Sequence, residues 1–278
     1  MKSMPLQHCG VSAATPRLRG ASDQRGFTLV EIMIAILIGV FLLGGLLTLV
    51  QTMKVTSLAQ NGLSQLQDNE RLAMRIMTDV IQATGDYPNP VANTPNLAFP
   101  ALPLAPFPSG FAKSQSIVGS GAAAAAPPGD EIAVRYATSG ADGLTNCVGG
   151  QSLTPVTFVN VFSIDPNGNL QCQLTTIDAG GGQTTVTATL VSGVTNLQIL
   201  YGVKTNTAVT TTGVDAYLDA NQVIGLPNPP GYAFPWIYIK SVKLTLTFSN
   251  PLAAQTGQPA TISLMRVVNV MNQVGETL

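Results

Sequence analysis

The chain of 278 residues has few charged side chains and no excess of positive charge. Lys, Arg, Asp and Glu together make up 10% of the residues, and the formal net charge is −1. Because nucleic-acid binding requires a basic face, this composition predicts no nucleic-acid partner.

Histidine is almost absent, since the single one, His8, lies close to the N-terminus. The rest of the sequence therefore lacks Ser-His-Asp and Cys-His catalysis and any His-based zinc site. The motifs of P-loops, dinucleotide-binding turns and zinc proteases are missing as well. We therefore expect no enzyme, no catalytic residue, no cofactor and no metal.

One polar segment, Asp165-Pro-Asn-Gly-Asn169, begins like a calcium-binding EF-hand loop. Such a loop needs glycine at its sixth position and glutamate at its twelfth, where this chain has Leu170 and Thr176. A plain turn is therefore the preferred interpretation, and a calcium site is the alternative.

What the chain does have is one long apolar run, residues 27–50, in which Glu31 is the only ionisable side chain. As a helix, a run of this length would extend about 36 Å, enough to cross a hydrocarbon core of about 30 Å. The preceding residues carry four basic side chains against one acid: Lys2, Arg17, Arg19 and Arg25 against Asp23. This excess of positive charge predicts a single-pass segment with a cytoplasmic N-terminus.

Glu31 needs an explanation, because an acid at bilayer depth costs about 2.5–3.5 kcal/mol and usually has a partner. Cleavage after Gly26 would create such a partner, the α-amino group of Phe27, which a neighbouring subunit could present to Glu31. Alternatively, Glu31 lies in the headgroup zone, where an acid at a helix start suits the helix dipole.

The residues Gly26-Phe27-Thr28-Leu29-Val30-Glu31 resemble the class III signal of type IV prepilins. In that family, prepilin peptidase cuts after the glycine and N-methylates the new terminal residue. The fifth mature residue is a glutamate that neutralises the amine of an adjoining subunit. The resemblance implies that residues 1–26 are a cleaved leader peptide, that Phe27 is methylated and that Glu31 acts in assembly.

After the apolar run, residues 51–84 continue as an amphipathic helix. Arg75 and Asp79 stand four residues apart on it, where they can pair weakly. Gly85 and the prolines that follow end the helix. The apolar positions recur mostly every three to five residues, as a helix with one apolar face requires: Val55, Leu58, Leu63, Leu66, Leu72, Ile76, Met77, Val80 and Ile81.

Residues 85–130 are rich in Pro, Gly and Ala, which predicts an irregular segment without regular structure. Residues 131–278 show the pattern of an antiparallel β domain, with a hairpin around the turn at 165–169 and a long loop at 204–231. The fold class is therefore α+β. The expected strands are 132–136, 156–164, 170–177, 184–191, 197–203, 236–248 and 261–270.

The three cysteines divide between the leader and the exported part. Cys9 would leave with the leader, whereas Cys147 and Cys172 remain. In an oxidising compartment this pair is expected to form a disulfide, and the closed loop would stabilise the fold by roughly 3.5 kcal/mol. Two buried free thiols are the alternative.

The later part of the chain is similar to minor pilins of the PilW type. The similarity lies in Cys147-Val-Gly-Gly, Asn169-Leu-Gln-Cys172, the segment from Leu190 to Gly202 and the late strand that begins at Ile239. It implies a pilin-like fold, in which a long N-terminal helix, half in the membrane and half amphipathic, packs on an antiparallel β-sheet domain.

The resemblance implies a minor pilin that joins or primes assembly of a type IV pilus, in its tip or initiation complex. Its expected partners are prepilin peptidase, other minor pilins, the major pilin, the inner-membrane assembly platform and, before assembly, membrane lipid. The expected location is the bacterial inner membrane with a periplasmic C-terminal domain, and then the pilus or cell surface.

Two other functions stay open at this point. The J-type pseudopilins of type II secretion are similar to the same family. An exported adhesin or binding domain, cut by general signal peptidase, is the less favoured alternative, because its weak site at Ser57-Leu58-Ala59 lies beyond an apolar run that is long for a signal peptide.

Overall fold

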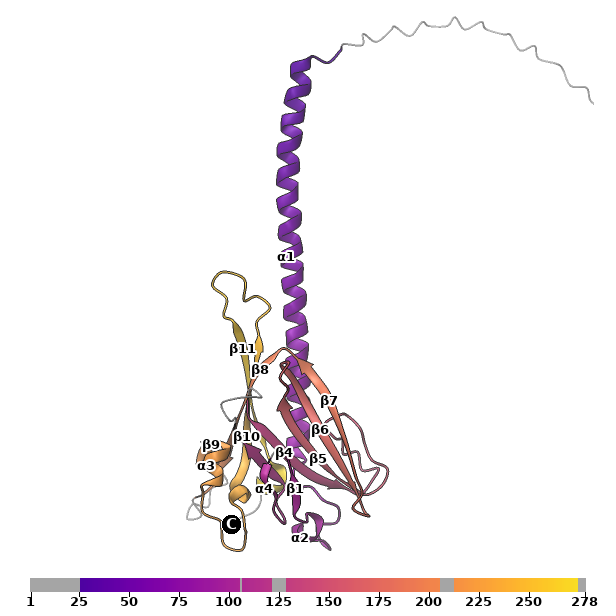
Figure 1. The fold of residues 1–278 in the computed structure, drawn as a ribbon, viewed down its shortest axis with the longest axis vertical. Helices are drawn as coiled ribbons and strands as arrows, with labels where there is room; N and C mark the ends of the chain where they lie inside the picture. Colours follow the sequence, from indigo (N-terminus) through magenta and orange to yellow (C-terminus); the bar gives the residue numbers. More distant parts are fainter. Residues whose placement is uncertain (1–25, 106, 122–128, 206–212, 275–278) are drawn as a thin grey trace, which may run out of the picture. The chain divides into compact units, whose positions relative to one another are not determined.

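A computed structural model describes residues 26–105, 107–121, 129–205 and 213–274 (Figure 1). The chain separates into two compact units, one up to Val55 and one from Thr56 onward. The described part of the first unit is almost entirely helical, whereas the second unit holds the end of the same helix and all the strands.

Helix α1 spans Leu29–Gln82 without a break at the predicted border between residues 50 and 51. Thr28 caps its first turn, since the backbone N–H of Glu31 donates to the Thr28 hydroxyl at 3.3 Å. Gly85, at φ +78°, follows the last turn in the left-handed conformation that favours glycine.

The second half of α1 packs its apolar face into the core of the second unit. The spacing of the buried residues confirms the predicted amphipathic pattern from residue 66 onward: Leu66, Ala73, Met74, Met77, Val80 and Ile81. The pattern is wrong for Leu72, which is 47% exposed, and Leu58 is 72% exposed.

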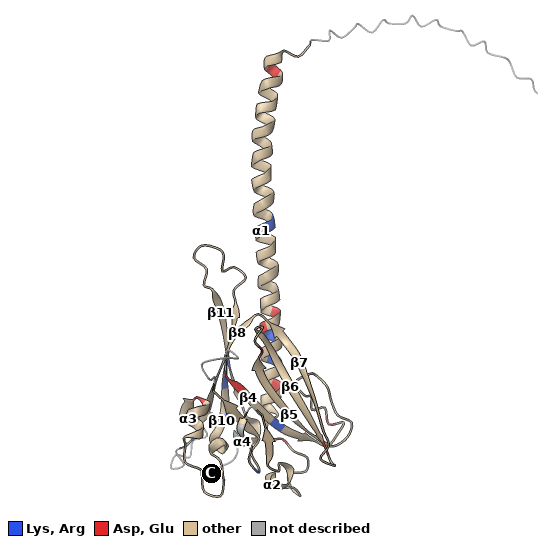
Figure 2. Cartoon of the chain, viewed as in Figure 1, with Lys and Arg blue, Asp and Glu red and all other residues tan. Residues whose placement is uncertain are grey.

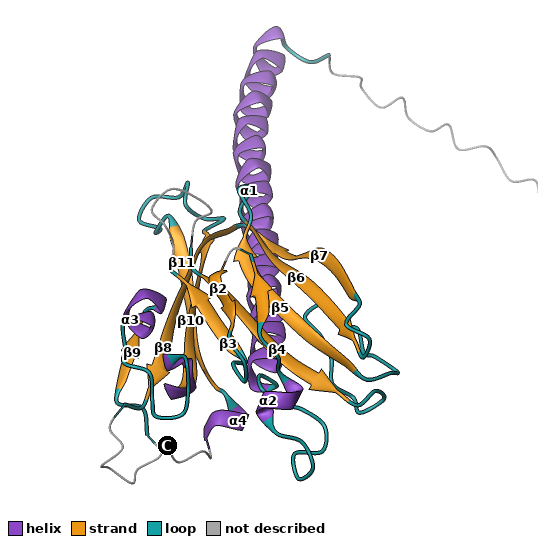
Figure 3. Cartoon of the chain, turned by 60° about the horizontal axis from the view of Figure 1, so that its bottom comes forward, coloured by secondary structure: helices purple, strands orange, loops and turns teal. Residues whose placement is uncertain are grey.

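Five strands form one antiparallel sheet in the order β3-β4-β5-β6-β7 (Figures 1 and 3). The predicted β5–β6 hairpin is confirmed, with Asp165 accepting backbone hydrogen bonds from Asn167 and Asn169 in the turn. The strands are β3 Ile117–Ser120, β4 Glu131–Thr138, β5 Val156–Ile164, β6 Asn169–Asp178 and β7 Gln183–Ser192.

Four strands form a second antiparallel sheet in the order β11-β10-β8-β9. One face of β10 is fully buried through Val242, Leu244, Leu246 and Phe248, as their alternation predicts. The strands are β8 Val194–Val203, β9 Ala216–Leu218, β10 Ile239–Ser249 and β11 Thr261–Asn269.

The two sheets share one hydrophobic core, whereas the sequence indicated a single sheet. The chain passes from β7 to β8 through Gly193 alone, at φ +82°, a conformation that breaks the strand and redirects the chain into the other sheet. A further difference is that β10 begins at Ile239 and not at Trp236. Pro235 opens a short 3₁₀ turn, η1 Pro235–Tyr238, before the strand.

The prediction that residues 85–130 are irregular is wrong for four short parts of this segment (Figure 3). It contains α2 Pro95–Ala98, the ribbon of β1 Leu102–Leu104 with β2 Phe107–Phe111, and β3. The predicted loop 204–231 likewise contains β9 and α3 Ala220–Ile224. Asp219 and Gln222 cap the first turn of α3. The alanine run 122–126 lies outside the described residues, and α4 Met271–Val274 ends the described chain.

A buried arginine explains how the Pro-rich segment is held. Arg135 on β4 is 1% exposed and donates to the backbone carbonyls of Pro100 and Gln115, both at 2.6 Å, and of Ala112 at 3.0 Å. Its guanidinium also lies 4.6 Å from the centre of the Phe111 ring. Proline has no backbone N–H, so this segment can form fewer ladder bonds, and the arginine supplies the missing donors.

Candidate processing and assembly site

The bond between Gly26 and Phe27 lies in an exposed, non-helical segment just before helix α1. Phe27 is 78% exposed, and a Cβ added to Gly26 would meet nothing within 4 Å. Residues 26–28 are not helical. A peptidase needs a substrate backbone that is free of secondary structure, so this geometry fits cleavage at this bond.

Glu31 stands in the first turn of α1 with an exposed side chain. The next basic residue along the helix is Lys54, about 35 Å farther along its axis. Figure 2 shows the long stretch of α1 without charge between these acidic and basic positions. A cation that pairs with Glu31 within the apolar part of the helix must therefore come from outside this stretch.

Thr28 is a residue of this segment that the sequence reasoning missed. Its hydroxyl and its carbonyl both accept from the backbone N–H of Glu31, the carbonyl at 3.0 Å. The spacing Thr28-x-x-Glu31 is the sequence signature of a capping box, and this pattern could have identified the helix start.

The apolar side chains that follow Glu31 are exposed in the isolated chain, as in Phe41 at 82% and Leu37 at 72%. No residue from 26 to 55 is buried. Helix α1 is long and apolar enough to cross a membrane, and within the described residues it is the one helix with this property. This is consistent with membrane anchoring.

The structure joins Cys147 and Cys172 in a disulfide, with their Cα atoms 6.3 Å apart. Both sulfur-bearing residues are fully buried. The backbone N–H of Cys147 donates to Asn160 Oδ1 on β5 at 3.0 Å, so the loop before β5 is tied to the sheet by a covalent bond and by a hydrogen bond. Tyr136 adds a third tie, because its hydroxyl donates to the carbonyl of Thr145.

In the turn at 165–169, the carboxylate of Asp165 is hydrogen-bonded within the turn itself. Besides the two backbone hydrogen bonds, Asp165 accepts one from Asn169 Nδ2 at 2.8 Å. The hydrogen bonds from Asn169 and Asn167 lower the pKa of Asp165. Among the described residues, no group of three His, Cys, Asp or Glu side chains lies in a position to hold a metal ion.

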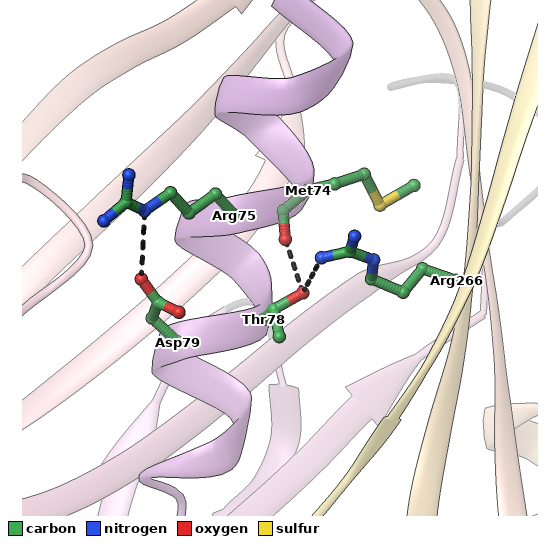
Figure 4. A network of polar contacts seen from close by, with 5 residues as sticks. All are labelled: Met74, Arg75, Thr78, Asp79 and Arg266. Atoms are coloured by element: carbon green, nitrogen blue, oxygen red, sulfur yellow. Dashed lines mark hydrogen bonds and ion pairs between the residues drawn. The ribbon is translucent and has the colours of Figure 1, made fainter.

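A small polar network marks two sides of α1 in the second unit (Figure 4). Arg75 and Asp79 form the predicted pair at 3.8 Å on one side. On the other side, Arg266 of β11 donates to the Thr78 hydroxyl at 3.3 Å, and Thr78 donates to the carbonyl of Met74. The exposed ion pair stabilises little. Arg266 links β11 to the helix through one exposed hydrogen bond.

Two family models match the chain. Residues 21–47 match the prokaryotic N-terminal methylation motif, which covers Gly26, Phe27 and Glu31. Residues 161–271 match type IV pilus-assembly protein W, a span that runs from β5 to the start of α4. A comparison with curated proteins found no match.

The long N-terminal apolar helix, the matched methylation motif and the antiparallel sheets are features of a class of protein, the prepilins with a class III signal. The second match narrows the class, and together the two support a PilW-type prepilin with an α+β, pilin-like fold. The matches imply interaction with the pilus assembly machinery and with other pilins. The matches thus support the role of a minor pilin of a type IV pilus.

Proposed function

We propose that the chain is cut between Gly26 and Phe27 by prepilin peptidase, that Phe27 is N-methylated, and that the mature subunit joins or primes a type IV pilus as part of its tip or initiation complex. The observation that carries this proposal is the exposed Gly26–Phe27 bond four residues before an acid in the first turn of a membrane-length helix. The subunit acts as a structural part and not as an enzyme.

Glu31 then has a defined task. After cleavage, the α-amino group of Phe27 in an adjoining subunit pairs with the Glu31 carboxylate in the apolar layer. The pair offsets the burial of both charges, since either charge left alone in that layer would be destabilising. It also sets the axial position of one subunit against the next.

The proposed location follows from the same segment. Before assembly, the subunit lies in the inner membrane, with the leader on the cytoplasmic side and the residues after α1 in the periplasm. It then enters the pilus. Its partners in this scheme are other minor pilins, the major pilin and the assembly platform.

The first test is the intact mass and the N-terminal residue of the membrane form. We expect a chain that begins at methylated Phe27. A chain that keeps residues 1–26 in functional filaments would contradict the proposal, and a soluble chain that begins at Gln60 would indicate export by general signal peptidase.

The second test compares Glu31→Gln with wild type, because this change keeps the shape of the side chain and removes its charge. We expect the Phe27 terminus to form normally, while incorporation into filaments falls about tenfold or more. Identifying the subunits crosslinked to the membrane form then separates a pilus from a secretion pseudopilus.

A further inference from the structure

Strand β7 is the last strand of the five-stranded sheet and lies at its outer margin (Figures 1 and 3). It pairs with β6 along one side, and no strand of the described residues pairs with its other side. The free side of β7 therefore presents backbone groups that the described sheet does not use.

The ladder shows which groups these are. The N–H of Asp178 donates to the carbonyl of Gly182 at 3.0 Å at the start of the β6–β7 hairpin. Because pairing alternates along an antiparallel ladder, the even-numbered residues of β7 bond to β6. The odd-numbered residues Gln183, Thr185, Thr187 and Thr189 direct their N–H and C=O groups to the free side.

This edge lacks the usual protection against another strand. Natural edge strands carry charge or proline, or they are short or bulged, whereas residues 183–192 contain no charge and no proline. The register shift near Leu190 leaves 183–189 regular. At the other sheet ends, β11 carries Arg266, and β3 and β9 are only four and three residues long.

A groove of about 470 Å³ lies at the end of the same strand, between the second half of α1, the loop 145–149 that carries Cys147, and residues 188–190 of β7. It is lined by apolar side chains that include Leu72, Ile76, Val148 and Leu190. Leu72 is 47% and Val148 41% exposed, so the groove is open in the isolated chain. Arg75 and Asp79 also line it, but they pair with each other and leave it without net charge.

Val186 extends this apolar surface along the strand. It lies opposite Leu174, which is buried, and so points to the inner face of the sheet, yet it is 51% exposed. An apolar inner-face position on an edge strand is normally covered. Among the described residues, no element covers this position, and Val186 stays half exposed.

We propose that the free edge of β7 and this groove together bind an extended, uncharged segment of another pilin subunit, which adds to the sheet as a further strand. The backbone edge selects a strand, because only an extended peptide supplies N–H and C=O groups at the spacing of residues 183–189. The groove selects an apolar side chain at every second position of that strand. This inference rests on the proposed function only for the source of the segment.

The arrangement favours a segment of a different pilin over strand β7 of a second copy of this chain. Antiparallel pairing of two β7 strands would relate two copies by a twofold axis and close a dimer, whereas subunits of a filament repeat by contacts that do not close. The neutral groove likewise suits a segment without charge.

The experiment places a photoreactive benzoylphenylalanine at Val148, on the rim of the groove, in the full chain expressed in its own membrane. The matched control position is Met265, which is 59% exposed on the other sheet. Adducts are identified by mass, and the N-terminal residue is read in the same samples.

Thr187 supplies the decisive variants, because its N–H points to the free side and is not used by β6. Thr187→Pro removes this donor, and Thr187→Lys places a charge on the edge, while Thr187→Val keeps the backbone. We expect an adduct between Val148 and another pilin that falls about tenfold in the Pro and Lys variants and is unchanged in the Val variant.

An adduct that survives both the Pro and the Lys variants, an adduct formed only with a second copy of this chain, or no adduct at Val148 in chains that begin at Phe27 would each overturn the inference. Chains that do not begin at Phe27 would instead overturn the proposed function. Resistance of the sheet to protease in the Pro and Lys variants shows whether a lost adduct reflects the edge or a failure to fold.

Discussion

At the scale of single residues, Arg135 stabilises the Pro-rich segment, which can form fewer backbone hydrogen bonds of its own. Burial lowers the pKa of its guanidinium to about 9, so it remains charged at neutral pH. Its donors reach carbonyls 20 to 36 positions away in the sequence. These carbonyls determine the cost of replacing the arginine. They belong to the backbone, so a substitution at position 135 leaves them in place without their donor.

We therefore predict that Arg135→Met destabilises the fold by about 2–4 kcal/mol, although methionine fits the apolar surroundings. Arg135→Lys should be destabilised less, since its ammonium keeps part of the donor set. Urea unfolding of the detergent-solubilised chain measures the loss. Limited proteolysis should show cleavage within 99–115 first, and resistance of this segment in the Met variant would contradict the assigned role.

Asp142 is a residue whose hydrogen bonds give a pH dependence. The Thr138 hydroxyl, followed by the backbone N–H groups of Ser139 and Leu144, lowers the pKa of its carboxyl from 3.8 to about 2. An acid whose pKa is lower in the folded than in the unfolded state stabilises the fold at any pH above the unfolded pKa. This contribution is lost as the pH falls from about 4 to about 2.

We predict that Asp142→Asn melts below wild type at pH 5 and that this difference narrows as the pH approaches 2. Because Asp142 is exposed, the effect is small and is read as a difference between two melting curves. A gap that stays constant with pH would show that the ionised carboxylate is not the cause.

At the scale of elements, the β5–β6 hairpin was predictable because its information is local: two β-rich runs flank a turn of Asp, Pro, Asn and Gly. The order within 85–130 was not, because part of it depends on donors from Arg135, which lies 20 to 36 positions from the carbonyls that it contacts. The division into two sheets rests on the backbone of Gly193, and a single glycine in a strand pattern does not announce a change of sheet. The proposed processing site lies at the other extreme, since residues 26–31 carry its whole pattern.

The disulfide is the element-scale feature with the clearest energetic prediction. It closes a loop of 25 residues and fixes the 145–149 loop that borders the groove. Reduction should lower the free energy of unfolding by roughly 3.5 kcal/mol in the chain-entropy model. The double variant Cys147→Ala with Cys172→Ala should show a similar loss and no response to reductant. If reductant alone leaves urea unfolding unchanged while the thiols become accessible to alkylation, the loop is held by Asn160 and Tyr136 instead.

At the scale of the whole molecule, the two units differ in where their apolar surface is directed. In the first unit the described side chains are exposed, and they suit lipid or the helices of other subunits. In the second unit the apolar side chains form one core that includes the end of α1 and both sheets. In the proposed function the first unit serves anchoring and assembly, whereas the second has the buried surface that a fold needs for independent stability.

We predict that a chain that begins at Thr56 folds without the first 55 residues, because it keeps every buried residue of α1 and the whole core. Its melting temperature should lie within about 3 °C of that of the detergent-solubilised full chain, since no buried contact is lost. Differential scanning fluorimetry of both forms measures this, and the matched control is a chain that begins after Ile81, which lacks the buried helix face. This control should fail to fold. If the chain from Thr56 fails as well, the exposed part of α1 contributes to stability in a way that burial does not show.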